Sequence, residues 1–171
     1  GGKILAEVLK ALKREAKEGI SLRHLDGLAY RLIKEKGAEP AFLGYRPDPD
    51  SRPFGGTICA SVNNVVVHGF PSDYILKSGD VLKIDAGVKY KNFFSDSALT
   101  VGIGKISKET ELLIKATEQA LEKAVKEMKS GKTLGDIGFA IQRVAEKNKL
   151  GVIRELTGHG IGFELHEEPT V

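Results

Sequence analysis

Apolar residues recur at helical spacing in the first part of the chain. Between residues 4 and 12 they lie three and four positions apart, and a second such series runs from Leu22 to Ile33. This spacing places the apolar side chains on one face of an α-helix. Gly19 and Gly37 follow the two series, and Ser21 stands where an N-cap is expected. The pattern therefore predicts two consecutive helices that end near these glycines.

The middle of the chain predicts a long loop and then strands. Residues 41 to 56 are rich in Pro, Gly and Asp, a composition that favours irregular structure. Strand-forming runs follow at four places: 57 to 62, 65 to 68, 81 to 88 and 93 to 101.

Helical spacing returns in the last third. Apolar positions from 112 to 128 predict a third helix, and Thr133 is the expected cap of a fourth helix with apolar positions from 137 to 144. Runs at 151 to 156 and 161 to 166 predict two final strands.

A weak internal repeat relates the two helix pairs. The order glycine, cap, leucine and helix at residues 19 to 26 recurs at residues 131 to 137. We therefore expect an α+β fold of two pseudo-symmetric halves, each with two helices followed by antiparallel strands. The second half ends before a hairpin that would match residues 81 to 101, and the chain begins at Gly1 instead of methionine, so we expect a chain shortened at both ends.

Composition and charge exclude several classes of protein. The chain has 171 residues, of which 41% are hydrophobic and 29% charged, which is enough for one packed core and excludes a disordered or fibrous protein. The net charge of +3 is spread along the chain, so no segment predicts binding to nucleic acid or to a membrane surface. No apolar stretch reaches the roughly 20 residues that cross a bilayer, and we expect a cytoplasmic protein.

Cys59 is the only cysteine. A single cysteine excludes an intrachain disulfide and fits a reducing compartment. It could act as a nucleophile with His68, which lies nine residues away, but its place in an apolar run favours a small buried side chain.

Two aspartates stand within strand-forming runs. If Tyr90, Lys91 and Asn92 form a turn, the strands that carry Asp85 and Asp96 pair antiparallel and the aspartates lie nearly opposite each other. Two carboxylates about 5 Å apart repel unless a cation neutralises them, and a bridged pair of divalent metals is one solution that hydrolases use. The alternative is that both carboxylates face solvent at the rim of the hairpin.

His159 lies in a glycine-rich segment, Thr157-Gly158-His159-Gly160-Ile161-Gly162. A neutral imidazole is a good metal ligand and would join the two carboxylates, while a turn histidine without a ligand is the alternative. A glycine-rich phosphate loop should open a helix, whereas the alternation of Ile161, Phe163 and Leu165 favours a strand.

His68 and His166 are further candidates. His68 follows an apolar run and precedes a Gly-Phe-Pro turn, and His166 lies seven residues after His159. Each fits a histidine that contacts a substrate or one that only supports the fold. A zinc-binding His-Glu-x-x-His helix is excluded at His166, because Thr170 replaces the second histidine and Pro169 would disrupt the helix.

Taken together, these motifs resemble those of the type I methionine aminopeptidases. The resemblance covers almost the whole chain and rests on five motifs in order: Cys59 to Pro71, Gly79-Asp80 with Ile84-Asp85, Ser95-Asp96, Gly158 to Gly162, and His166-Glu167-Glu168-Pro169. It implies the pita-bread fold, in which two similar αβ halves form a curved antiparallel sheet that holds two divalent metals. This fold agrees with the internal repeat.

The resemblance also implies roles for individual residues. Asp85 and Asp96 match the bridging metal carboxylates, and His159 matches the histidine ligand, of a site for two divalent ions such as Co, Mn, Fe or Zn. His68 and His166 match the histidines that contact substrate and help to stabilise the tetrahedral intermediate. Four residues match the lining of the methionine pocket: Phe42, Tyr45, Cys59 and Leu165.

The implied activity is removal of the initiator methionine from nascent polypeptides at the ribosome, by a metal-activated water. The family has two further glutamate ligands downstream, so the resemblance makes residues 1 to 171 one catalytic domain that lacks its C-terminal strands and has little activity by itself. A proline-specific peptidase of the same superfamily and a non-catalytic binding module with this fold are the alternatives. The segment from 59 to 71 argues against the first, and the filled ligand positions argue against the second.

Overall fold

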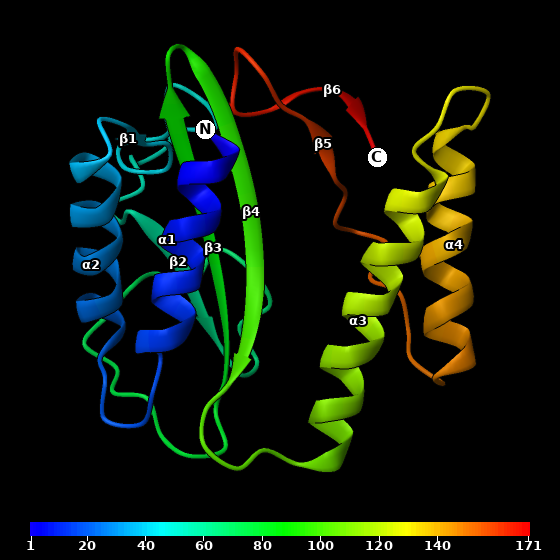
Figure 1. The fold of residues 1–171 in the computed structure, drawn as a ribbon, viewed down its shortest axis with the longest axis horizontal. Coiled ribbons are helices and arrows are strands. Elements are labelled where there is room, and N and C mark those ends of the chain that lie inside the picture. Colours follow the sequence, from blue (N-terminus) through cyan, green and yellow to red (C-terminus); the bar gives the residue numbers. More distant parts are fainter. The chain divides into compact units, whose positions relative to one another are not determined.

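The computed structural model describes every residue from Gly1 to Val171. The chain divides into two compact units, residues 1–106 with 161–167 and residues 107–160 with 168–171. The first unit contains α1 (Gly2–Glu15), α2 (Leu22–Glu35), β1 (Glu39–Pro40), β2 (Ile58–Val62), β3 (Val81–Tyr90) and β4 (Phe93–Gly102) (Figure 1). The second contains α3 (Lys108–Glu127), α4 (Leu134–Lys147), β5 (His159–Gly160) and all but the first residue of β6 (Glu167–Thr170).

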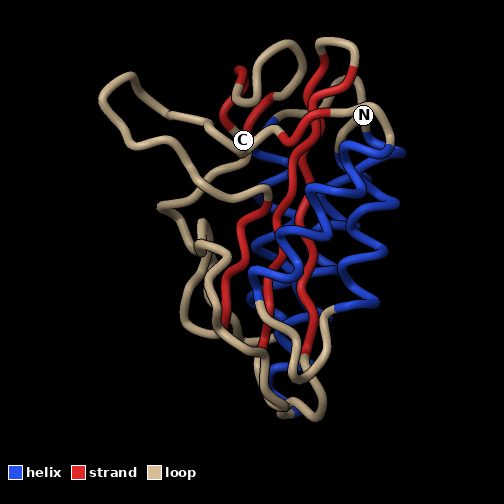
Figure 2. Tube along the Cα trace, turned by 90° about the vertical axis from the view of Figure 1, so that its left-hand side faces the viewer, coloured by secondary structure: helices blue, strands red, loops and turns tan.

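The two N-terminal helices form where the apolar spacing predicts them. The Ser21 side chain accepts a hydrogen bond from the backbone N–H of His24 and so caps α2. Each helix buries one stripe of its surface, which in α1 consists of Leu5, Val8, Leu9 and Leu12. Both helices lie against the same side of the sheet of the first unit (Figures 1 and 2).

β3 is the central strand of that sheet. It pairs with β4 along one edge and with β2 and β1, one after the other, along the opposite edge, and every pairing is antiparallel. The buried side chains on one face of β3 are Leu82, Ile84, Ala86 and Val88, and they form the main core with α1 and α2. The strand is therefore held on both edges and on one face.

The second unit is a helical hairpin with a short two-stranded sheet. Ser107 caps α3, and Thr133 and Asp136 form a capping box at the start of α4. Of the apolar face predicted for α3 only Ala116, Ala120 and Ala124 are buried, at a spacing of four residues. None of the four helices in the chain combines the length and the apolar character that crossing a membrane requires.

Three of the predicted strands were wrong. Val65, Val66 and Val67 are 42–51% exposed, because the chain leaves the edge of β2 between Asn63 and His68, which both have positive φ. Residues 151 to 156 form no strand, and residues 161 to 166 form the connection between β5 and β6. A run of β-branched and apolar residues indicates that the side chains favour burial. It forms a strand only if another strand is available to pair with its edge.

Replacing Gly27 with alanine is expected to stabilise the chain by about 0.5–1 kcal/mol, because Gly27 lies inside α2 and a Cβ there meets no atom within 4 Å. Gly19→Ala is the matched control. A Cβ at Gly19 also meets nothing within 4 Å, but φ is +86°, so alanine is expected to cost about 1–2 kcal/mol. Urea unfolding measures both changes, and a Gly27→Ala chain less stable than the parent would contradict this account of α2.

Candidate functional site

The face of β3 that the helices do not cover carries the candidate site. Side chains alternate along a strand, so the burial of Ile84 and Ala86 in the helix-covered core directs Asp85 to the opposite face. Cys59 on β2 is the register partner of Asp85 and lies on the same face. Packing in the core thus determines where the first candidate ligand points.

Asp96 reaches the same face from β4. Asp85 pairs with Ala98 and Asp96 pairs with Gly87, so the two aspartates are diagonal neighbours on adjacent strands. The prediction of adjacent antiparallel strands is confirmed. The prediction that the aspartates lie nearly opposite each other was wrong, because the register partner of each aspartate lies two residues from the other aspartate.

The difference arises at the turn. Tyr90 pairs with Phe93 and belongs to the ladder, and only Lys91 and Asn92 form the connection. Both have positive φ, 51° and 66°, which is the geometry of a type I′ hairpin turn. The predicted three-residue turn was one residue too long, and this shifts the register of the two strands.

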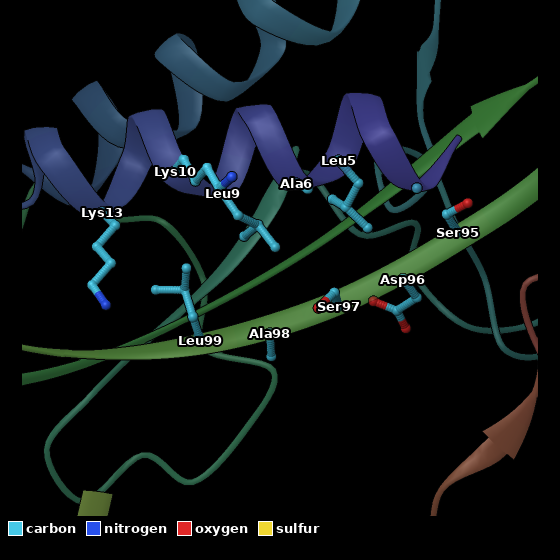
Figure 3. Close-up of a pocket in the computed structure, with 11 residues that line it drawn as sticks. Leu5, Ala6, Leu9, Lys10, Lys13, Ser95, Asp96, Ser97, Ala98 and Leu99 are labelled. Carbon is cyan, nitrogen blue, oxygen red and sulfur yellow. The ribbon is translucent and has the colours of Figure 1, made fainter. Parts of the chain in front are cut away.

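The alternation along β4 is visible beside α1. Ser97 and Leu99 point towards α1, whereas Asp96 and Ala98 lie on the other side of the strand (Figure 3). A groove of about 360 Å³ lies between α1 and β4, and Asp96 borders it. Asp96 therefore borders the groove, while its side chain lies on the side of β4 away from α1.

The two carboxylates converge. Burial raises the pKa of Asp85 to about 7, and the charge of Asp96 and a hydrogen bond between the two side chains act in the same direction. The shared face and this mutual effect on the pKa are what the convergence predicted from the sequence requires. Paired carboxylate oxygens suit hard divalent cations, and a bound cation would offset the repulsion between them.

An apolar cluster adjoins this pair. Phe42, Cys59 and Leu165 are buried together with Ala41, and Tyr45, Phe54 and Phe94 pack against them. The four residues that the sequence assigned to a pocket are thus brought together, from three distant parts of the chain. Phe54 and Phe94 were missed, although Phe94 stands two residues before Asp96 and so faces the same side of β4.

Gly87 connects the cluster to the carboxylates. It lies two residues after Asp85 on the same strand and is the register partner of Asp96. A Cβ at this position would lie 2.7 Å from Phe42 Cε1 and 2.9 Å from the Cβ of Ala41. The Phe42 ring therefore packs directly on the backbone of β3 at a position next to both aspartates, and the site needs a residue without a side chain there.

Cys59 is a buried member of the cluster, with 6% of its surface exposed. Burial raises the pKa of its thiol to about 12, and the negative charges of Asp85 and Asp96 add to this effect. A thiol that stays protonated is a poor nucleophile. The structure therefore favours the buried, apolar interpretation of Cys59 over the nucleophilic one.

His166 lies beside the cluster and contacts Tyr45. The Tyr45 hydroxyl and His166 Nδ1 are 2.7 Å apart, and the two ring centroids are 5.3 Å apart. Leu165 anchors the segment because it is 4% exposed, whereas the imidazole of the next residue is exposed. This hydrogen bond had no signal in the sequence, since it joins residues 121 positions apart.

His68 lies in an exposed loop and not at the end of a strand. The loop is attached at both ends to the sheet. The Asn63 side chain donates a hydrogen bond to the Asp80 carboxylate, Asn63 and Val81 each donate one to the other, and the Asn63 carbonyl accepts one from Lys83. At the other end of the loop, the Gly69 carbonyl accepts a hydrogen bond from the Ala60 N–H. These attachments fix the ends of the segment that presents His68.

His159 lies in β5, in the second unit. Its Nδ1 donates to the carbonyl oxygen of Gly160 at 2.9 Å, which leaves the lone pair on Nε2, the arrangement that metal ligation through Nε2 requires. The structure contains no group of three or more His, Cys, Asp or Glu side chains arranged to hold a metal. Two of the three predicted ligands are thus brought together, and the role of His159 as the third stays a prediction.

Comparison with known sequences gives one consistent family. The model of metallopeptidase family M24 matches residues 1–171. Methionine aminopeptidase 1 of Bacillus subtilis is 42% identical and methionine aminopeptidase of Clostridium perfringens is 44% identical, each over 170 residues. These alignments cover 99% of this chain and 66% of each relative, so the chain spans slightly less than two thirds of their length.

Solved structures agree with the fold. Methionine aminopeptidase from Thermotoga maritima matches with a TM-score of 0.93 at 34% identity, over 99% of this chain and 66% of that one. The enzyme from Rickettsia prowazekii gives 0.92 at 35% identity, over 98% and 65%. Prolidase from Pyrococcus furiosus gives 0.82 at 24% identity, over 98% and 47%, and shares the fold alone. The expected pita-bread fold is confirmed.

The thiol of Cys59 is expected to react with iodoacetamide at pH 8 more than about 100-fold more slowly in the folded chain than in the same chain unfolded in urea. The physical reason is that a pKa near 12 and burial leave very little accessible thiolate. Mass spectrometry after timed quenching gives both rates. Comparable rates would show that Cys59 is an accessible nucleophile.

Asp96→Asn is expected to lower the pKa of Asp85 from about 7 in the metal-free protein. The substitution removes the neighbouring negative charge while burial remains, so the charged form of Asp85 becomes less unfavourable. Carboxyl ¹³C chemical shifts followed against pH report the change. Asp73→Asn is the control, since Asp73 is an exposed aspartate paired with Arg23, and an unchanged Asp85 titration in Asp96→Asn would contradict the coupling.

Proposed function

The chain belongs to metallopeptidase family M24, and we propose that the protein that carries it is a methionine aminopeptidase. Its reaction would be removal of the N-terminal methionine from nascent polypeptides. The relatives at 42–44% identity are methionine aminopeptidases, and the chain spans 66% of their length.

One observation carries the proposal: an apolar cluster of the right composition for a methionine side chain lies directly beside a pair of carboxylates. Cys59 belongs to the cluster and is the register partner of Asp85, and Phe42 packs on Gly87, which is next to both aspartates. A thioether chain is apolar and flexible, and aromatic and sulfur-containing surroundings suit it. A peptide with its first side chain in the cluster would have its scissile bond near Asp85 and Asp96.

Asp85 and Asp96 would hold the two divalent ions that we propose for this site, with His159 as a further ligand. The support is the shared face and hydrogen bond of the two carboxylates and the Nδ1–H donation of His159 to Gly160. When bound, such ions supply a water that is nucleophilic at neutral pH and polarise the peptide carbonyl. The carboxylates themselves would lose the proton that their mutual repulsion favours in the metal-free chain.

His68 and His166 are assigned to the substrate. His166 lies next to Leu165 of the cluster, so its imidazole would reach the peptide group that follows the bound side chain. His68 is presented by a loop that is attached at Asn63 and Gly69. Both would donate hydrogen bonds to substrate oxygen atoms as negative charge develops there.

A proline-specific peptidase is the second candidate, and it is less well supported. The prolidase structure shares the fold at only 24% identity, whereas the relatives at above 40% identity are methionine aminopeptidases. With nascent chains as the substrate, we place the protein in the cytoplasm near the ribosome.

The test compares cleavage of Met-Ala-Ser and Ala-Pro peptides by the protein that carries this chain, with manganese or cobalt present. We expect cleavage of Met-Ala-Ser only, and a loss of more than about 100-fold in Asp96→Asn, since removing a ligand should cost more than removing a group that only supports one. Calorimetry with manganese alone should show the matching loss of metal affinity.

Asp73→Asn makes the same chemical change at an exposed site and should leave cleavage unchanged. Faster cleavage of Ala-Pro would transfer the assignment to the second candidate. Absence of any cleavage, together with absence of metal binding, would overturn the proposed function and leave the non-catalytic module as the alternative.

A further inference from the structure

We propose that Tyr45 is a positioning residue whose hydroxyl group fixes the tautomer and the orientation of the His166 imidazole. The proposal rests on the proposed function, because it concerns the histidine that would contact the substrate. It adds a second role to Tyr45, which the sequence assigned only to the lining of an apolar pocket.

The first support is that both partners are anchored, Tyr45 by backbone hydrogen bonds and His166 by the buried side chain of its neighbour. The N–H of Tyr45 donates to the Phe42 carbonyl at 2.9 Å, and the carbonyl of Tyr45 accepts from the N–H of Phe54 at 2.9 Å. His166 follows Leu165, which is buried in the apolar cluster. The 2.7 Å contact between the hydroxyl and Nδ1 therefore joins two anchored segments and is not a meeting of two mobile side chains.

The second support is the chemistry of the contact. A neutral imidazole carries its proton on one nitrogen, and a hydrogen bond to the other nitrogen decides which one. If the Tyr45 hydroxyl donates to Nδ1, the proton lies on Nε2, which becomes the donor nitrogen. A donor at Nε2 is what stabilisation of a developing oxyanion requires.

The third support is that the contact between Tyr45 and His166 contributes little to the stability of the fold. The Tyr45 ring is half-buried and His166 is exposed, so one hydrogen bond between them adds little to that stability. Removing the hydroxyl should therefore change the state of the imidazole much more than the stability of the fold.

The experiment reads the tautomer directly. The chain has four histidines, so long-range ¹H–¹⁵N spectra of the protein labelled at histidine resolve each imidazole, and His166→Gln assigns the His166 signals. We expect His166 with an unprotonated Nδ1 and a protonated Nε2. In Tyr45→Phe, which keeps the ring, the Nδ1 signal should shift towards that of a tautomer mixture.

Tyr30→Phe is the matched control, because it removes the hydroxyl of an exposed tyrosine on α2. It should leave the His166 signals unchanged. A protonated Nδ1 in the parent protein, or identical His166 signals in the parent and Tyr45→Phe, would overturn the proposal. The remaining histidine signals show whether each variant has kept its fold.

Kinetics separate this proposal from the proposed function. With Met-Ala-Ser, Tyr45→Phe should lower kcat by about 10-fold and leave KM nearly unchanged, as expected for a group that supports another. A raised KM with unchanged kcat would mean that Tyr45 only lines the pocket, and would overturn the positioning role. If the parent protein cleaves no methionyl peptide, the proposed function fails while the spectra still decide whether Tyr45 fixes the tautomer.

Discussion

The site depends on the way β3 is held. Hydrogen bonds to β4 on one edge and to β2 and β1 on the other leave the strand no freedom to rotate, and the burial of Leu82, Ile84, Ala86 and Val88 commits one face to the helices. Asp85 must then point to the other face, although its carboxylate would be better solvated elsewhere. The core therefore supplies the free energy that keeps an unfavourable charge in place.

The same constraint shapes the surroundings of the carboxylates. An uncovered sheet face would normally be polar, but here aromatic side chains from the loop after β1 and Leu165 from the segment before β6 cover part of it. Their presence lowers the local polarity and contributes to the raised pKa values of Asp85 and Cys59. The proposed site, for a cation beside an apolar side chain, needs both properties at once, and the sheet provides them on one surface.

The helices and the two long strands could be predicted from the sequence because each carries its own local signal. These signals are the spacing of apolar residues, an N-cap residue, or a glycine that ends the helix. Ser21, Ser107 and Thr133 all cap helices through their side chains, two of them as predicted. The strand predicted at 65 to 68 failed because Val65, Val66 and Val67 have no neighbouring strand. The contact of Tyr45 with His166 could not be inferred at all, since it depends on how two distant loops meet over the sheet.

The two-residue turn at Lys91 and Asn92 bears on how the protein can evolve. Because faces alternate at every step of β4, a single residue inserted into that turn would carry Asp96 from the face that it shares with Asp85 to the side of α1 unless a bulge absorbed it. An insertion of two residues would keep Asp96 on its present face of the sheet. In descendants of this sequence, insertions and deletions should therefore accumulate in loops such as 46 to 56, and selection should remove them from the hairpin. The length of the turn determines which face of the sheet carries Asp96.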